Sequence, residues 1–336
     1  MQKLFSILVL SSFLSGQVLA FSDIQITNQL YISTTYLSTA EIISGYDDGL
    51  FKPDNIINRA EALKIILVAN EEEVQEVSTS RFSDVPAGAW FSKYVNYAAE
   101  KGFVSGDDAT GLFVPDRIVN RAEFLKMLVK SFDIDTSKYV LNVKSKDVPE
   151  DAWFAPFINF AIKFEVMNRD SEDMAFPDKA LTRGEAAQII FNMLKKGQGL
   201  DAQKVLNLTE SHLLKSLEFI EEGNIPAAGL VVVTAEKFAN TAIEIQNVSK
   251  NEIVLGAQKT AESLKHLVGA FSAGQNGRLD EIIVAAKAAY KAAEESLVLN
   301  PKNEEMLNKV KTLASGLATK ARERKEELEA GNSNSE

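Results

Sequence analysis

A repeated thirteen-residue pattern is the feature that most constrains how this chain can fold. Residues 49–61 read GLFKPDNIINRAE and residues 111–123 read GLFVPDRIVNRAE, so ten of the thirteen aligned positions are identical. Residues 174–185, MAFPDKALTRGE, form a looser third copy. An aspartate also stands 36 or 37 residues before each motif arginine; the pairs are Asp23 with Arg59, Asp84 with Arg121, and Asp147 with Arg183. Two elements that recur together at a nearly fixed distance predict three repeats, at about 21–77, 78–140 and 141–196.

Each repeat has the pattern of a helix, a loop and a second helix. Apolar residues recur at helical spacing in the first part of each repeat, at 29–43, 89–104 and 152–167. A loop rich in Gly and Asp follows, as in residues 44–55, and these residue types suit tight turns. The second helix is predicted to begin at the motif, where Asn or Thr is followed three residues later by Glu, the pattern of a capping box.

The motif arginines are predicted at the first position of these second helices. A cation there faces the positive end of the helix dipole, which costs about a few tenths of a kcal/mol. Because three equivalent positions share the feature, we expect each guanidinium group to meet an acid. One candidate is an internal carboxylate, such as Asp23, Asp84 or Asp147, in a structural ion pair. The other is an anionic ligand beside the helix N-terminus, where backbone N–H groups also favour negative charge, and the residues alone leave both open.

The N-terminal segment has the features of a secretory signal. Lys3 is followed by the apolar run 4–16 and by small residues at 18–20, which predicts cleavage before Phe21. A membrane anchor is the alternative, but the run is short for a span of about 20 residues. No later run is comparably long and apolar, so we expect no membrane span in the mature chain. The chain has no cysteine, which excludes disulfides, cysteine–zinc sites and thiol catalysis.

Charge and motif content exclude other functions. The net charge of -11 argues against a general nucleic-acid binder, which needs a basic surface. The two histidines, His212 and His266, are 54 residues apart and lack metal-ligand spacing, so we expect both to be structural or exposed. No hydrolase or phosphate-binding motif is present. We therefore predict neither enzymatic activity nor a metal or cofactor site.

The C-terminal part is rich in Ala, Glu, Lys and Leu. Residues 195–203 are predicted to be a linker, and breaks containing Gly, Asn or Pro separate five helical segments. We predict these helices at 204–222, 226–247, 250–273, 278–299 and 303–329. Together they would form an α-helical bundle or hairpin stack over 197–329, followed by a disordered tail at 330–336.

The motif set of the first 196 residues resembles the S-layer homology domain. It combines FSDV at 82–85, a tryptophan six residues after the repeat aspartate (Trp90, Trp153), GYDDG at 45–49 followed by FKPD, and NRAE or TRGE. The resemblance covers about 175 residues. It implies a mainly α fold in which three helix-loop-helix repeats pack with pseudo-threefold symmetry. It also implies an exported bacterial protein, attached non-covalently to a secondary cell-wall polysaccharide that is often pyruvylated and linked to peptidoglycan.

The resemblance implies which residues would contact the glycan. Arginine can bind the carboxylate of a pyruvyl group through two N–H bonds, tryptophan offers a flat face to a sugar ring, aspartate can bond hydroxyls or orient arginines, and glycine permits close approach. The candidates are Arg59, Arg121, Arg183, Trp90, Trp153, Asp23, Asp84, Asp147, Gly45 and Gly106. Gln29 replaces the tryptophan of the first repeat, and Asn168 stands where the third repeat should have its loop glycine. We therefore expect one or two working grooves rather than three.

Three functions remain open at this point. The first is anchoring, in which residues 21–196 bind an anionic wall glycan and the C-terminal helices project outward or bind a protein partner. The second is a structural envelope or S-layer assembly protein that acts mainly by self-association through 197–329. The third is a wall hydrolase with a site hidden among the C-terminal helices. The resemblance favours anchoring.

Overall fold

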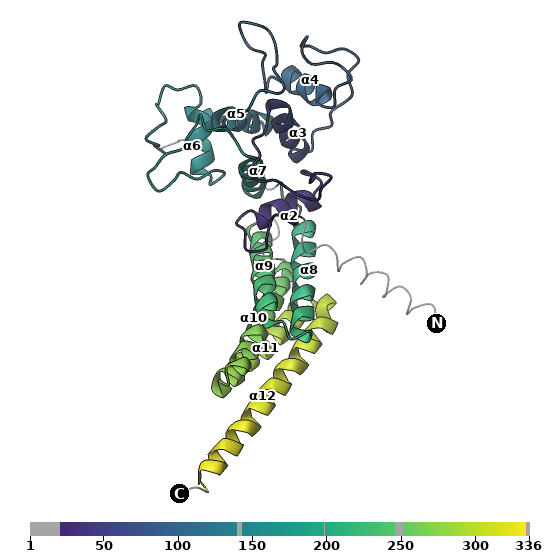
Figure 1. The fold of residues 1–336 in the computed structure, drawn as a ribbon, viewed down its shortest axis with the longest axis vertical. Coiled ribbons are helices and arrows are strands. Elements are labelled where there is room, and N and C mark those ends of the chain that lie inside the picture. Colours follow the sequence, from purple (N-terminus) through teal and green to yellow (C-terminus); the bar gives the residue numbers. More distant parts are fainter. Residues whose placement is uncertain (1–20, 140–142, 198, 246–250, 334–336) are drawn as a thin grey trace, which may run out of the picture. The chain divides into compact units, whose positions relative to one another are not determined.

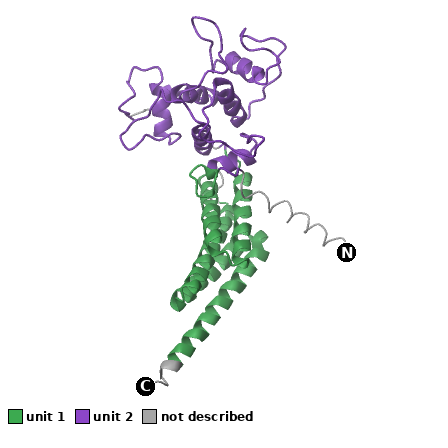
Figure 2. Ribbon diagram, viewed as in Figure 1, with its two compact units in different colours: residues 1–20, 24–32, 200–336 green, residues 21–23, 33–199 purple. Residues whose placement is uncertain are grey.

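The computed structural model describes residues 21–139, 143–197, 199–245 and 251–333, and the predicted signal segment lies outside them. The described chain forms two compact units. One contains residues 21–23 and 33–199, which we call the repeat unit, and the other contains residues 24–32 together with the chain from residue 200 onward, which we call the helical unit (Figure 2).

The described residues are mainly α-helical, as predicted, and the helices of the three repeats follow one another in helix-loop-helix order (Figure 1). They are α2 (Tyr31–Thr39), α3 (Arg59–Ala69), α4 (Ser92–Glu100), α5 (Arg121–Ser131), the short 3-10 helix Thr136–Lys138, α6 (Ala155–Lys163) and α7 (Arg183–Gly197).

Local capping chemistry explains where the second helix of each repeat begins. The Asn58 side chain accepts from the backbone N–H of Glu61, and the Glu61 carboxylate accepts from the N–H of Asn58, which completes the predicted capping box. Asn120 repeats this arrangement at α5, and Thr182 repeats it at α7. Each helix therefore starts at the motif arginine, as predicted.

Backbone hydrogen bonds close the three repeats into a ring. The N–H of Ile57 donates to the carbonyl of Leu181 (3.1 Å), that of Leu181 to Val119 (3.0 Å), and that of Val119 back to Ile57 (3.3 Å). These three side chains are equivalent in sequence and buried. Because the cycle closes, the three repeats have the predicted pseudo-threefold relation. Each repeat contributes one short extended segment to the ring.

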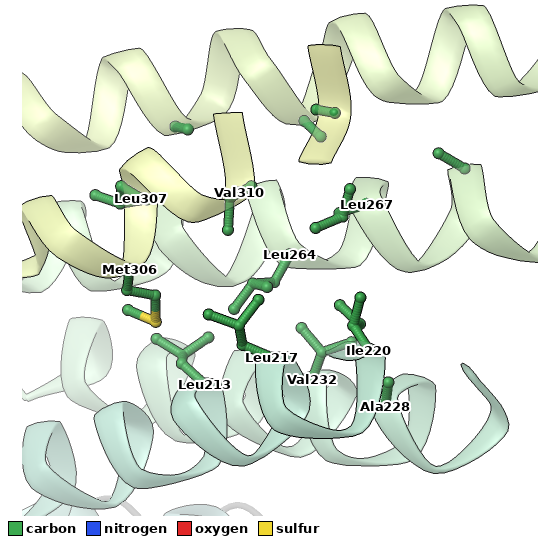
Figure 3. Packing of buried hydrophobic residues seen from close by; sticks show 14 of the residues in the cluster. Leu213, Leu217, Ile220, Ala228, Val232, Leu264, Leu267, Met306, Leu307 and Val310 are labelled. Carbon is green, nitrogen blue, oxygen red and sulfur yellow. The ribbon is translucent and has the colours of Figure 1, made fainter. Parts of the chain in front are cut away.

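The helical unit contains five helices close to the predicted positions. They are α8 (Ala202–Glu221), α9 (Ile225–Glu244), α10 (Glu252–Gln275), α11 (Leu279–Leu299) and α12 (Glu304–Ser333). Small and branched apolar side chains such as Leu217, Leu264 and Leu307 form their common core (Figure 3). The helix α12 continues beyond the predicted end at residue 329, because residues 320–330 are mostly good helix formers.

Tyr31 and His212 join the N-terminal segment of this unit to its helices. The Nδ1 of His212 donates to the carbonyl of Leu208 (2.7 Å), so Nε2 is the acceptor of the Tyr31 hydroxyl (3.1 Å). Both side chains are buried. The prediction of satisfied or exposed histidines is confirmed, since His212 is buried with both nitrogens bonded and His266 is 42% exposed.

Candidate functional site

Each motif arginine holds the loop of the next repeat around the ring. Arg59 donates from Nε to the carbonyl of Phe113 and from Nη2 to that of Ser105, both at 3.2 Å. The other two follow the same cyclic rule: Arg121 reaches Ala175 of the third repeat at 2.8 Å, and Arg183 reaches Ser44 and Phe51 of the first. The unfavourable helix position is thus explained by carbonyl partners in a neighbouring repeat.

The helix N-termini offer no backbone N–H group to a ligand. At α3, the N–H groups of the first two residues, Arg59 and Ala60, donate to the carbonyls of Arg117 (2.9 Å) and Pro115 (3.1 Å). The third is taken by the capping residue, as described above, and α5 and α7 repeat the pattern. The predicted binding of an anion by these N–H groups is therefore wrong, because ring closure uses them.

The repeat aspartates fix the same loops. Both carboxylate oxygens of Asp84 accept backbone N–H bonds, from Phe113 (3.0 Å) and Val114 (2.7 Å), and Val114 has a left-handed φ of +57°. Asp23 and Asp147 do the same for their own loops. No ion pair links these aspartates to the motif arginines in the described chain, so the candidate of an internal ion pair fails for the aspartates; Arg121 pairs instead with Glu185 at 2.6 Å. None of these three aspartates lines any of the three grooves described below, so their role is to position the loops.

Three grooves lie beside the three arginines, and they are named by their lining residues. Groove A is lined by Arg183, Ser44, Gly45, Tyr46, Glu61, Lys64 and Trp90, among others. Groove B is lined by Arg59, Ser105, Gly106, Arg117, Glu123, Lys126 and Trp153, among others. Groove C is lined by Arg121, Asn168, Arg169, Asp170, Phe176 and Lys179. Each groove therefore combines the arginine of one repeat with the loop of the next.

Grooves A and B each combine one half-exposed tryptophan with a lysine. Trp90 is 53% exposed and Trp153 is 52% exposed, so neither is a core residue. The Lys64 ammonium lies 5.7 Å from the centre of the Trp90 ring, and Lys126 lies 5.0 Å from that of Trp153. This arrangement presents an apolar face, an indole N–H and two cations on one surface.

The motif arginines of grooves A and B have no ion-pair partner in the described ranges. No carboxylate lies within 4 Å of Arg59 or Arg183 in the described ranges, and burial lowers the pKa of both guanidinium groups. In groove B, burial first and then the charges of Lys130 and Arg59 lower the pKa of Lys126. A lowered pKa in a cation means that its charged form is unfavourable there. An added anion would relieve this cost.

Gly45 lines groove A and Gly106 lines groove B, but contacts within the chain already require glycine at these two positions. A Cβ atom at Gly45 would lie 2.7 Å from the Phe21 ring, and one at Gly106 would lie 3.1 Å from the Phe82 ring. In the third repeat Ser145 replaces this phenylalanine, and Arg169 occupies the position of the glycine. The predicted register, with Asn168 at that position, is off by one residue, because Asp170 and Met174 form the same turn bond as Tyr46 and Leu50.

Two further residues became evident only in the structure. Lys64 and Lys126 each stand five residues after the motif arginine, a spacing that the sequence already contains. The equivalent residue of the third repeat is Gln188, which accepts from the Ser33 hydroxyl (3.0 Å). Groove C thus lacks both the tryptophan and the lysine of the other two.

The comparisons with known proteins agree with this geometry. The S-layer homology domain model matches three segments of the chain, at residues 20–63, 81–125 and 146–187. Each matched segment contains the repeat aspartate, the loop and the motif arginine. Residues 20–187 therefore contain three tandem copies of the S-layer homology domain.

Several characterised proteins share this region. The chain is 29% identical over 164 residues to the cellulosome-anchoring protein of Acetivibrio thermocellus, which covers 47% of this chain and 36% of that protein. It is 28% identical over 171 residues to S-layer protein EA1 of Bacillus anthracis, covering 51% of this chain and 20% of that protein. It is 27% identical over 169 residues to exoglucanase XynX of Acetivibrio thermocellus, covering 49% and 15%.

These relatives are longer proteins, and the chain matches 36% or less of the length of each. The similarity to the exoglucanase lies in the S-layer homology region, so it carries no argument for catalysis in this chain. Domain content and relatives indicate an exported protein of the bacterial cell surface. None of the helices in the described ranges is long and apolar enough to cross a membrane.

Proposed function

We propose that this protein anchors itself non-covalently to an acidic polysaccharide of the bacterial cell wall through grooves A and B. The observation that carries the proposal is the position of its tryptophans. The chain has two, and each is half-exposed in a groove beside an arginine without a carboxylate partner. The cellulosome-anchoring relative and the domain family support the same role.

The chemistry of the two grooves suits a carboxylated sugar such as a pyruvyl ketal. The indole face would pack against the sugar ring, and its N–H would donate to a hydroxyl. The Nη1 groups of Arg59 and Arg183 have no acceptor in the described ranges, so they could donate to the ligand carboxylate. Lys64 and Lys126 would add positive charge beside the tryptophan of their groove.

The helical unit would then be the part that is displayed. In this proposal residues 21–196 form the docking region, and residues 197–329 project from the wall or bind a protein partner. The five helices bury a continuous apolar core, which supports a stable module rather than a linker.

Co-sedimentation with isolated bacterial cell walls tests the anchoring function. The full chain is expected to pellet with the walls, and the double variant Trp90→Ala/Trp153→Ala is expected to bind more than about tenfold more weakly, the effect typical of a buried aromatic contact. Mild acid, which cleaves pyruvyl ketals, should reduce binding to the walls in the same way.

Tyr139→Ala is the matched control, because Tyr139 is 42% exposed and lies in none of the three grooves. It should pellet like the unchanged chain. Equal pelleting of the tryptophan double variant and the control would show that grooves A and B do not bind the wall. Full binding to acid-treated walls would show that the acid-labile substituent is not the group that binds, while grooves A and B would remain the proposed binding site.

A further inference from the structure

We infer that Glu185 blocks Arg121, the motif arginine that lines groove C, by pairing with it from within the chain, so that the chain has two glycan sites, in grooves A and B. This inference rests on the proposed function. It concerns a difference among three glutamates at the same helical position, namely Glu61, Glu123 and Glu185.

The three glutamates all cap their own helices, but their cation partners differ. Glu185 Oε1 lies 2.6 Å from Arg121 Nη2 and 2.7 Å from Lys179 Nζ. Glu123 instead pairs with Arg117 at 2.7 Å, and leaves Arg59 without a carboxylate. Glu61 has no cation within 4 Å in the described ranges. In groove C, therefore, the motif arginine is already paired with a carboxylate of the chain.

The orientation of the guanidinium groups agrees with this difference. Arg121 uses both Nη1 and Nη2, one for the carbonyl of Ala175 and one for Glu185. Arg59 and Arg183 use Nε and Nη2, so that Nη1 has no acceptor in the part of the chain described. In Arg121, therefore, Nη1 is held by the Ala175 carbonyl and Nη2 by Glu185, so neither terminal nitrogen is open to a ligand.

A glycan carboxylate would have to displace Glu185 to bind Arg121. An intramolecular group competes at a high effective concentration, since no translational freedom is lost when it binds. The Glu185 carboxylate also offsets part of the charge of Arg121 and Lys179. Although burial raises it, hydrogen bonds from Lys179 and Arg121 lower the pKa of Glu185 below its ordinary value, so it stays ionised at neutral pH.

Groove C also offers a sugar fewer contacts than grooves A and B do. Its lining contains no tryptophan, and Gln188 stands where grooves A and B have lysine. Arg169 replaces the loop glycine, and its guanidinium donates to the carbonyl of Lys144 and pairs with Asp173 at 3.0 Å. Every cation that lines groove C therefore has a carboxylate partner within the chain.

Equilibrium dialysis of the full chain against a pyruvylated hexose methyl glycoside, labelled with ¹⁴C in the ketal methyl group, counts the sites. Two probe molecules should bind at saturation. The three matched variants each replace one motif arginine with lysine. They are matched because every motif arginine holds the loop of a neighbouring repeat. Arg59→Lys and Arg183→Lys should each weaken one site by about tenfold, since lysine lacks the planar fork, whereas Arg121→Lys should change neither site.

Glu185→Gln tests whether the Glu185 carboxylate is what blocks Arg121. Glutamine can still cap the helix, so the fold should persist, and a third, weaker site should appear because Arg121 is released. Glu165→Gln is the control, because Glu165 lies in the same repeat, pairs with Lys196 and lines none of the three grooves; it should keep two sites.

The outcomes separate the inference from the proposed function. Three sites in the unchanged chain, a weakened site in Arg121→Lys, or two sites in Glu185→Gln would each overturn the inference while anchoring stands. No saturable binding by any variant, with no change in tryptophan fluorescence, would remove both for this class of ligand.

Discussion

At the scale of single residues, one aspartate per repeat fixes the loop that the motif arginine of the preceding repeat holds. We predict that Asp84→Ala lowers the free energy of unfolding of the repeat unit by about 3 kcal/mol, because the two charge-assisted hydrogen bonds that hold Phe113 and the left-handed Val114 in place are lost. Chemical denaturation followed by tryptophan fluorescence measures this, since both tryptophans lie in the repeat unit.

The control for this variant is Asp108→Ala, at an exposed position in the same repeat. Its effect should stay within about 0.5 kcal/mol. Equal losses in the two variants would mean that the Asp84 carboxylate does not position the loop.

The loop glycines give a second prediction at this scale. Gly45→Ala should destabilise the repeat unit by about 1–3 kcal/mol, because the added Cβ would lie 2.7 Å from the Phe21 ring. Gly88→Ala, which adds a Cβ with no atom within 4 Å, should be neutral or slightly stabilising. Thermal unfolding of both variants checks this, and equal melting temperatures would contradict the role assigned to Gly45.

At the scale of elements, the buried His212 makes α8 sensitive to pH. Burial lowers the pKa of His212, and the bond to the Leu208 carbonyl offsets this only in part. The unfolded chain therefore binds a proton at His212 more readily than the folded chain. This contribution to the free energy of unfolding is present above about pH 6.5, the ordinary histidine pKa, and is lost as the pH falls below it.

Denaturation followed by circular dichroism between pH 7.5 and 5.5 measures the effect. We expect His212→Gln to show a smaller loss of stability across this range than the unchanged chain. His266→Gln, at an exposed position, should keep the full pH dependence. The same pH dependence in all three proteins would show that His212 is not the responsible group.

Local signals in the sequence predicted the elements well. Helical periodicity and capping residues such as Asn58 and Asn120 act over three or four positions, so they determined where the helices begin. The partners of the arginines could not be predicted in this way. Arg59 meets Ser105 across 46 positions and Arg183 meets Phe51 across 132, and a backbone carbonyl leaves no mark in the sequence.

The candidate site was predicted in part for the same reason. The resemblance to the S-layer homology domain implied Arg59, Arg183, Trp90 and Trp153 as site residues, and these four line grooves A and B. It also assigned ligand roles to aspartates that the structure uses to hold loops, because a repeated residue is equally expected from ring closure and from binding. Whether the groove residues contact a glycan stays a prediction.

At the scale of the whole molecule, anchoring and self-association make different predictions about mass. The most exposed apolar residues of the helical unit, Val284 (69%) and Val298 (82%), stand apart on α11, and single exposed residues are normal on a monomer. We therefore expect the full chain to sediment as a monomer over a wide range of concentrations. A concentration-dependent dimer or larger species in sedimentation velocity would instead favour the S-layer assembly function.

The central claim is that the two tryptophan grooves are where the wall glycan binds. Incorporation of 5-fluorotryptophan into the full chain gives one ¹⁹F resonance per groove, assigned with Trp90→Phe and Trp153→Phe. Titration with soluble wall polysaccharide should shift both resonances in a saturable manner. If the chain binds the polysaccharide while both resonances stay in place, the glycan binds elsewhere on the protein and the claim is wrong.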